Sequence, residues 1–137
     1  MKTEEIKHDH SVIAKIFYKG PIQPGVHFYC ENDSSLQVGK QLRGKGEMIR
    51  PHRHIPVTVE RKETLKEVLY IEKGKVKITF YTDDWKEIGS RTLKAGDMVM
   101  LISGGHGFEM LEETEMIEIK QGPYDPGVTQ RRGDEKP

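Results

Sequence analysis

The sequence predicts an all-β protein, folded as a β-sandwich or a small barrel. Its 137 residues include nine Val and twelve Ile, but only two Ala and seven Leu. Branching at Cβ favours strands, whereas Ala and Leu favour helices. Fourteen Gly and seven Pro supply turn residues, and the apolar content of 34% is low for a sheet buried on both faces. These residue counts and the low apolar content fit a sandwich or barrel with a polar outer face.

A single domain is expected at this length, with a short extension at each end. Residues 1–11 are rich in charge and are predicted to be a flexible arm, residues 12–120 a barrel, and residues 121–137 an extended tail. Alternation of apolar and polar residues, punctuated by turn residues, predicts the strands of the barrel. They are expected over residues 12–18, 26–30, 36–42, 68–71, 75–81, 85–93, 98–102, 108–111 and 115–119.

Residues 64–74 allow two interpretations. Thr64 and Glu67 match a helix capping box, and the apolar residues that follow Thr64 have helical spacing. Gly74 would limit such a helix to about two turns, which is too short to be stable without strong docking. The alternative is a strand that turns at Gly74 into the alternating residues 75–81. We predict the two strands, because one hairpin accounts for both halves of the region.

Charge and cysteine content exclude several classes of function. The 22 basic residues balance the 22 acidic ones and form no dense run, which argues against nucleic-acid binding. The single Cys30 can form neither an internal disulfide nor a thiolate zinc site, and it suits a reducing compartment. No apolar stretch approaches the ~18 residues of a membrane span, and the N-terminus does not resemble a secretion signal. We predict a cytoplasmic protein without nucleic-acid or membrane partners.

Three histidines and one glutamate are the candidate ligands of a metal ion. His52 and His54 are two residues apart, so their side chains point the same way in an extended segment, and the flanking prolines disfavour a helix there. Imidazole nitrogens and carboxylate oxygens are common ligands of first-row divalent metals. Together with Glu67 and His106, the pair could hold an ion and leave positions open for a substrate.

The spacing of these residues resembles the two sequence motifs of the cupin superfamily. The matching residues are Gly46, His52, His54, Glu67 and Gly74 in the first motif, and Gly96 and His106 in the second. The resemblance covers roughly residues 36–120. It implies a small single-domain cupin, or monocupin, folded as a double-stranded β-helix (jelly-roll) barrel, with the metal held by the three histidines and Glu67.

The chain also departs from the cupin pattern. Twelve residues separate His54 from Glu67, where cupins have three or four. In the second motif, Ile102 replaces the usual Pro, Met110 replaces the usual Asn, and the spacing before His106 is one residue short.

The long spacing leaves Glu60 as an alternative acidic ligand. Glu67 is preferred because its six-residue spacing to Gly74 places it at the start of a strand that faces the interior. Residues 55–66 are expected to form a lid or a dimer contact.

The resemblance implies a metalloprotein acting on a small oxygenated substrate, with carbohydrate as one candidate class. Fe, Mn, Ni, Co, Cu and Zn all suit the ligand set, and Glu67 is the candidate proton shuttle in catalysis. Cupins include isomerases, epimerases and dioxygenases, so the reaction type stays open. The alternative is a non-catalytic module that binds a sugar or other small molecule, with a structural metal or none. A homodimer is expected from exposed edge strands.

Overall fold

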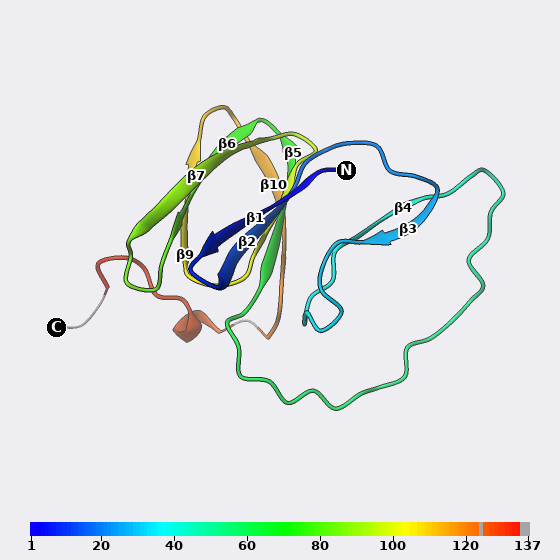
Figure 1. The fold of residues 1–137 in the computed structure, drawn as a ribbon, viewed down its shortest axis with the longest axis horizontal. Helices are drawn as coiled ribbons and strands as arrows, with labels where there is room; N and C mark the ends of the chain where they lie inside the picture. Colours follow the sequence, from blue (N-terminus) through cyan, green and yellow to red (C-terminus); the bar gives the residue numbers. More distant parts are fainter. Residues whose placement is uncertain (124, 135–137) are drawn as a thin grey trace.

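The regular structure of the protein is almost entirely antiparallel strand in the computed structural model, which describes residues 1–123 and 125–134 (Figure 1). The strands are β1 (Thr3–His8), β2 (Ser11–Phe17), β3 (Gly25–Phe28), β4 (Gly39–Leu42), β5 (Glu67–Lys73), β6 (Lys75–Tyr81), β7 (Glu87–Lys94), β8 (Met98–Leu101), β9 (Gly105–Met110) and β10 (Glu115–Lys120). A 3-10 turn, η1 (Pro126–Val128), is the one helical element among the described residues. This confirms the predicted all-β class. In the described part of the chain, no helix is long and apolar enough to span a membrane.

Two antiparallel sheets enclose the main hydrophobic core. The larger sheet has the strand order β1-β2-β8-β5-β10, and the smaller has the order β7-β6-β9. Alternate side chains of the central strands point into the space between the sheets and are buried there. The core side chains include Ile16, Leu69, Ile71, Val99 and Leu101 from the larger sheet, and Val76, Ile78, Phe80 and Leu93 from the smaller.

A second, smaller core lies on the other face of the larger sheet. There Phe17, Val68 and Met100 pack with Val38, which precedes β4. The β3–β4 pair forms a separate two-stranded sheet beside the main sheets (Figure 1). The Val38 contact therefore ties this small hairpin to the body of the protein.

The predicted hairpin at Gly74 is confirmed. Strands β5 and β6 flank Gly74, whose φ of +87° lies in the left-handed region that favours glycine. A Cβ atom at this position would meet the carbonyl oxygen of Glu113 at 2.2 Å. Residues 64–66 contain no helix, so the capping-box interpretation does not hold.

The N-terminal residues differ from the expected flexible arm. Residues Thr3–His8 form β1, which pairs with β2 along its length and places Ile6 in the core with 6% exposure. The charged residues of β1 have partners: Glu5 accepts a hydrogen bond from Lys15 over 3.2 Å, and Glu4 contacts Tyr18 and Arg91. These residues form a strand because side chains alternate along it, so the charged residues point outward while Ile6 points into the core.

Tyr18 provides a pH probe of the contact between β1 and its neighbours. Its hydroxyl donates to Glu4 Oε2 over 2.6 Å, and burial together with this bond raises the pKa of Tyr18 to about 12. The stability gained by keeping Tyr18 protonated is therefore present below pH 10 and lost as the pH rises from 10 to about 12. Ultraviolet titration is expected to show one late-titrating tyrosine that Tyr18→Phe removes. A late transition that persists in Tyr18→Phe but disappears in Tyr70→Phe would contradict this assignment.

The predicted closed barrel is not formed, because the segment between β4 and β5 lies outside the sheets. Residues 43–66, called the long segment below, contain no strand and are exposed as far as residue 65. They leave the body as a wide loop (Figure 1). Among the described residues, β9 pairs only with β6, and β10 pairs only with β5. The predicted tail, residues 121–137, has η1 as its regular element in the described part, and Tyr124 and residues 135–137 lie outside the described residues.

Candidate functional site

Glu67 and His106 meet between the two sheets. Glu67 begins β5 and pairs with Leu101, so its side chain faces the same way as the core residues of that sheet. His106 on β9 is opposite the buried Phe80 of β6 and also faces inward. The imidazole Nε2 lies 3.0 Å from Glu67 Oε1. Two of the four predicted ligands, one from each motif, are thus in direct contact.

Lys120 completes this cluster. In the register of β5 and β10 it lies directly opposite Glu67, and its Nζ is 3.3 Å from Glu67 Oε2. The hydrogen bond from His106 lowers the pKa of Glu67 to about 2, with a further contribution from the charge of Lys120, although burial acts in the opposite direction. Glu67 is therefore an ionised carboxylate, held by two nitrogen donors, with only 12% of its side chain exposed.

The chain positions Glu67 by fixing the residue before it. The backbone N–H of Lys66 donates to Gln121 Oε1 over 2.7 Å, and the N–H of Gln121 donates to the Lys66 carbonyl over 3.3 Å. The Lys66 ammonium group donates to Ser35 Oγ over 2.6 Å and to Glu63 Oε2 over 2.8 Å. These contacts, called the Lys66 clamp below, hold the end of the long segment where β5 begins.

His106 lies in strand β9, whereas the strands expected from the sequence, 98–102 and 108–111, leave residues 103–107 between them. Gly104 makes the turn, with a φ of +66° and with the carbonyl oxygen of Tyr81 at 2.3 Å from the position of a Cβ. The chain then enters β9 at Gly105, next to the Trp85 ring. The glycines therefore allow β9 to approach β6 and Trp85 closely, and this approach directs His106 inward.

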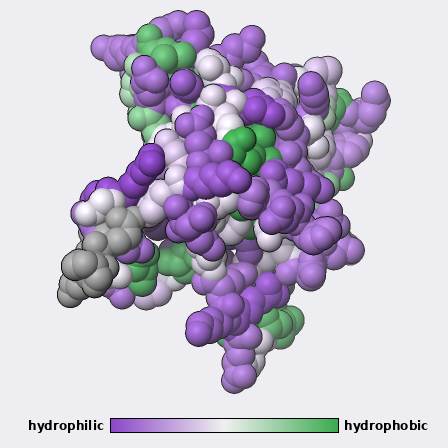
Figure 2. Space-filling model, turned by 60° about the vertical axis from the view of Figure 1, so that its left-hand side comes forward, coloured by the Kyte–Doolittle hydropathy of each residue, from purple (hydrophilic) through white to green (hydrophobic). Residues whose placement is uncertain are grey.

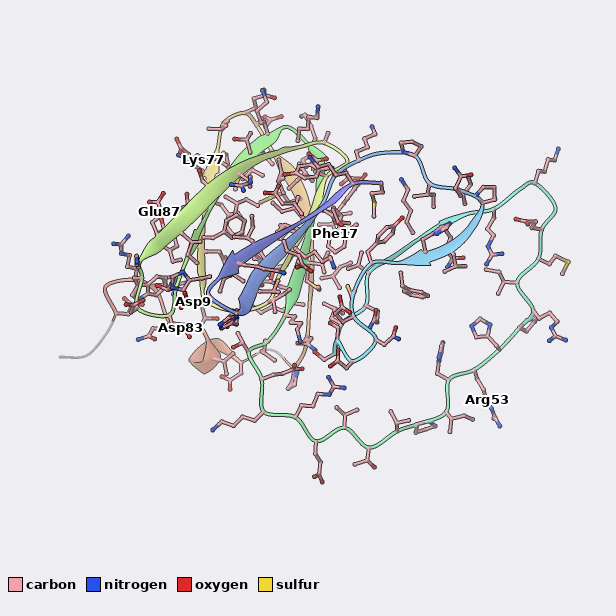
Figure 3. The ribbon with its side chains drawn as sticks, viewed as in Figure 1. Asp9, Phe17, Arg53, Lys77, Asp83 and Glu87 are labelled. Carbon is pink, nitrogen blue, oxygen red and sulfur yellow. The ribbon has the colours of Figure 1, made fainter. Side chains whose placement is uncertain are left out.

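His52 and His54 lie apart from this cluster. Their ring centroids are 5.5 Å apart on the exposed long segment, and His52 Nδ1 is 3.0 Å from the Arg50 carbonyl oxygen. Figure 3 shows Arg53, the residue between them, well away from Lys77 and Glu87 on the smaller sheet. Glu60, the alternative ligand, is also exposed on this segment.

The described conformation therefore does not hold a complete metal site. Within residues 1–123 and 125–134, no group of three or more His, Cys, Asp or Glu side chains lies close enough to bind one ion. The donors exist as two separate pairs, Glu67 with His106 and His52 with His54. The donor types suit a divalent transition metal, but one pair must move to the other before the set fits an ion.

Lys120 is a site residue that the sequence analysis missed. The alternation of residues 115–120 pointed the other way, because it favours Ile117 and Ile119 as the inward side chains, but these are 46% and 56% exposed. The sequence predicts only that these residues form a strand. Lys120 lies opposite Glu67 because of the register between β10 and β5.

A small cavity adjoins this cluster through Lys120. Its volume is about 180 Å³, and its lining combines apolar side chains with the polar residues of the chain after β10. Lining residues include Leu65, Lys120, Gln121, Pro123 and Val128. Elsewhere the face shown in Figure 2 is mostly hydrophilic, with a few separate hydrophobic patches. This volume is below the roughly 300–1,000 Å³ of typical small-molecule pockets, so the cavity suits only a small ligand.

Comparisons of the chain with protein-family models, with curated proteins and with solved structures find no match.

Proposed function

We propose that this protein is a cupin-like metal-binding protein that acts on a small oxygenated molecule. The observation that carries the proposal is the contact between Glu67 and His106, which come from different sheets and meet in the interior as the cupin pattern requires. Two of the four expected donors are therefore already together. The ion would be held by His52, His54, Glu67 and His106, once the long segment brings its two histidines to the other pair.

The chemistry of the cluster supports the binding of an ion and of an oxygenated ligand. A bound divalent metal supplies Lewis-acid or redox chemistry to oxygen atoms of a substrate. Glu67 is an ionised carboxylate with 12% of its side chain exposed, so it suits a cation, and its lowered pKa of about 2 makes it a weak base in this conformation. Lys120 lies between Glu67 and the cavity and can donate a hydrogen bond to a hydroxyl or carbonyl oxygen there. Small polyols and sugars carry such oxygens.

Metal binding tests the proposal directly. We expect the unmodified protein to bind one equivalent of Ni²⁺, Mn²⁺ or Zn²⁺ in isothermal titration calorimetry after treatment with a chelator. Loss of an outer-shell partner typically weakens metal sites by 10–100-fold, so removal of ligands in His52→Ala/His54→Ala or in Glu67→Gln is expected to weaken binding by at least about 100-fold.

The chain offers a matched control for the histidine pair. His8 and His10 have the same spacing near the N-terminus but belong to neither motif, so His8→Ala/His10→Ala is expected to leave metal affinity unchanged. Equal losses in both double variants, or no stoichiometric binding at all, would contradict the metal-binding proposal. In the second case, the cavity beside Lys120 favours the alternative function, a non-catalytic module for a small hydroxylated molecule.

A further inference from the structure

The chain after β10 is anchored to both main sheets. This part of the chain is called the strap below, and its described residues are 121–123 and 125–134. At its start, Gln121 is hydrogen-bonded to Lys66, next to β5 of the larger sheet. Near its end, the guanidinium carbon of Arg132 lies 5.5 Å from the centroid of the Tyr81 ring, at the end of β6 in the smaller sheet. Figure 1 shows the strap running below β5 and β9 toward the connection between β6 and β7.

Both anchors lie beside residues of the candidate site. Lys66 directly precedes Glu67, and Tyr81 is opposite Gly105, the residue before His106. The strap is therefore fixed at two points that flank the contact between Glu67 and His106. It crosses the end of the two sheets at which these side chains meet.

The strap forms most of the wall of the cavity beside Lys120. The lining residues that belong to it are Gln121, Gly122, Pro123, Asp125, Val128 and Thr129. The other lining residues are Leu65 and Lys120. A ligand that reaches Lys120 through this cavity thus also touches the strap, so the position of the strap decides how large that ligand can be.

Two turns shape the strap and present Arg132. In the first, Asp125 Oδ1 accepts a hydrogen bond from the Gly127 N–H over 2.8 Å at the start of η1. In the second, the Asp134 N–H donates to the Arg131 carbonyl over 3.0 Å, and the Arg131 N–H donates to Asp134 Oδ2 over 3.3 Å. Arg132 lies at the corner of this second turn.

The Tyr81 ring is a fixed partner for the Arg132 guanidinium. It packs edge to face against Trp85, with 6.2 Å between the ring centroids, and it lies 3.8 Å from the Cβ position of Gly107 on β9. The face of an aromatic ring attracts a cation placed over it. The contact with Arg132 therefore has a favourable electrostatic component as well as packing.

We propose that Arg132 is a positioning residue of the candidate site: its contact with Tyr81 is a latch that holds the strap over the cavity and limits the size of the ligand that reaches Lys120. The proposal rests on the proposed function only in what it says of the ligand. The latch itself rests on the Arg132 contact and on the cavity wall. An exposed cation–π contact changes an equilibrium by about 2–5-fold, so the strap can open while the sheets stay folded.

Chemical labelling of Lys120 tests the latch without a ligand or a metal. The unmodified protein is treated in EDTA with a bulky amine reagent, a biotin succinimidyl ester, and separately with formaldehyde and borohydride, which methylate lysine. Peptide mass spectrometry gives the rates at Lys120 and at Lys94, an exposed reference at the end of β7 away from Tyr81. In Arg132→Gln we expect the bulky reagent to react with Lys120 about 2–5-fold faster, with methylation and Lys94 unchanged.

Arg131→Gln is the matched control. Arg131 is the neighbouring arginine, and its two hydrogen bonds in the turn are made by its backbone, so this variant is expected to label like the unmodified protein. Tyr81→Leu should reproduce Arg132→Gln, and Tyr81→Phe should not, because it keeps the ring. The double variant Arg132→Gln/Tyr81→Leu should be no faster than either single variant, as expected for two partners in one contact.

Three outcomes would overturn the proposal: no faster biotinylation in Arg132→Gln, equal acceleration in Arg131→Gln, or acceleration at Lys94 as well. Urea unfolding of Arg132→Gln is expected to match that of the unmodified protein, and a large loss of stability would show that the strap supports the fold and does not act as a latch. Metal binding without this labelling pattern removes the inference and leaves the proposed function. The labelling pattern without metal binding does the reverse.

Discussion

Replacing Ile6 with Asp is expected to lower the free energy of unfolding by about 3 kcal/mol, as is typical for an unpaired charge placed in a core. Ile6 is 6% exposed and packs with the side chains that fill the space between the two sheets. Because β1 is an edge strand of the larger sheet, the substitution should also release it from β2. Urea unfolding measures the loss of stability, and hydrogen exchange in β2 measures the release.

Lys7→Gln is the control for this prediction. Lys7 is the next residue along β1 but is exposed, and its contact is a surface ion pair with Glu5 at 2.7 Å. Surface pairs contribute about 1 kcal/mol or less, so this variant should be close to the unmodified protein. If Ile6→Asp were equally harmless, residues 1–11 would be the flexible arm that their charge suggests.

Replacing Gly74 with Ala is expected to destabilise the protein by about 3 kcal/mol or more, measured by urea unfolding. The left-handed φ of +87° costs an alanine roughly 1–2 kcal/mol. The Cβ would also lie 2.2 Å from the backbone oxygen of Glu113, which cannot move without disturbing the connection between β9 and β10. Both strands of the central hairpin therefore depend on this glycine.

Gly25→Ala separates the two contributions. Gly25 also has a positive φ, +107°, but nothing lies within 4 Å of its Cβ position. This variant is expected to lose only the conformational part. If the two variants lose the same free energy of unfolding, the contact with Glu113 does not contribute to the effect of Gly74→Ala.

The strands that could be predicted from the sequence are those whose pattern reflects burial on one face. Val76, Ile78 and Phe80 alternate with polar residues, and they are the buried centre of the smaller sheet. Strand β1 could not be predicted in this way, because it has one buried apolar residue, Ile6, among charged ones. Its stability depends on partners distant in sequence, such as Arg91 for Glu4.

The candidate site could be predicted in part for the same reason. Glu67 and His106 lie on regular strands fixed by glycine turns, so motif spacing was enough to indicate that they would meet. The contribution of Lys120 depends on the register of β10 against β5, which spacing along one strand does not reveal. His52 and His54 lie on a segment whose placement depends on a long connection, and the twelve residues after His54 carry no pattern that fixes its path.

The unpaired edge of β9 also bears on solubility. A strand edge with free backbone groups next to exposed apolar side chains is a template for pairing with another chain, and proteins usually protect such edges. Here the edge borders Phe108 and Met110, which are 38% and 49% exposed. Pairing of this edge with another chain would leave the contacts within the two main sheets in place. Aggregation, rather than loss of folding, is therefore the failure expected when the apolar character of this edge is increased.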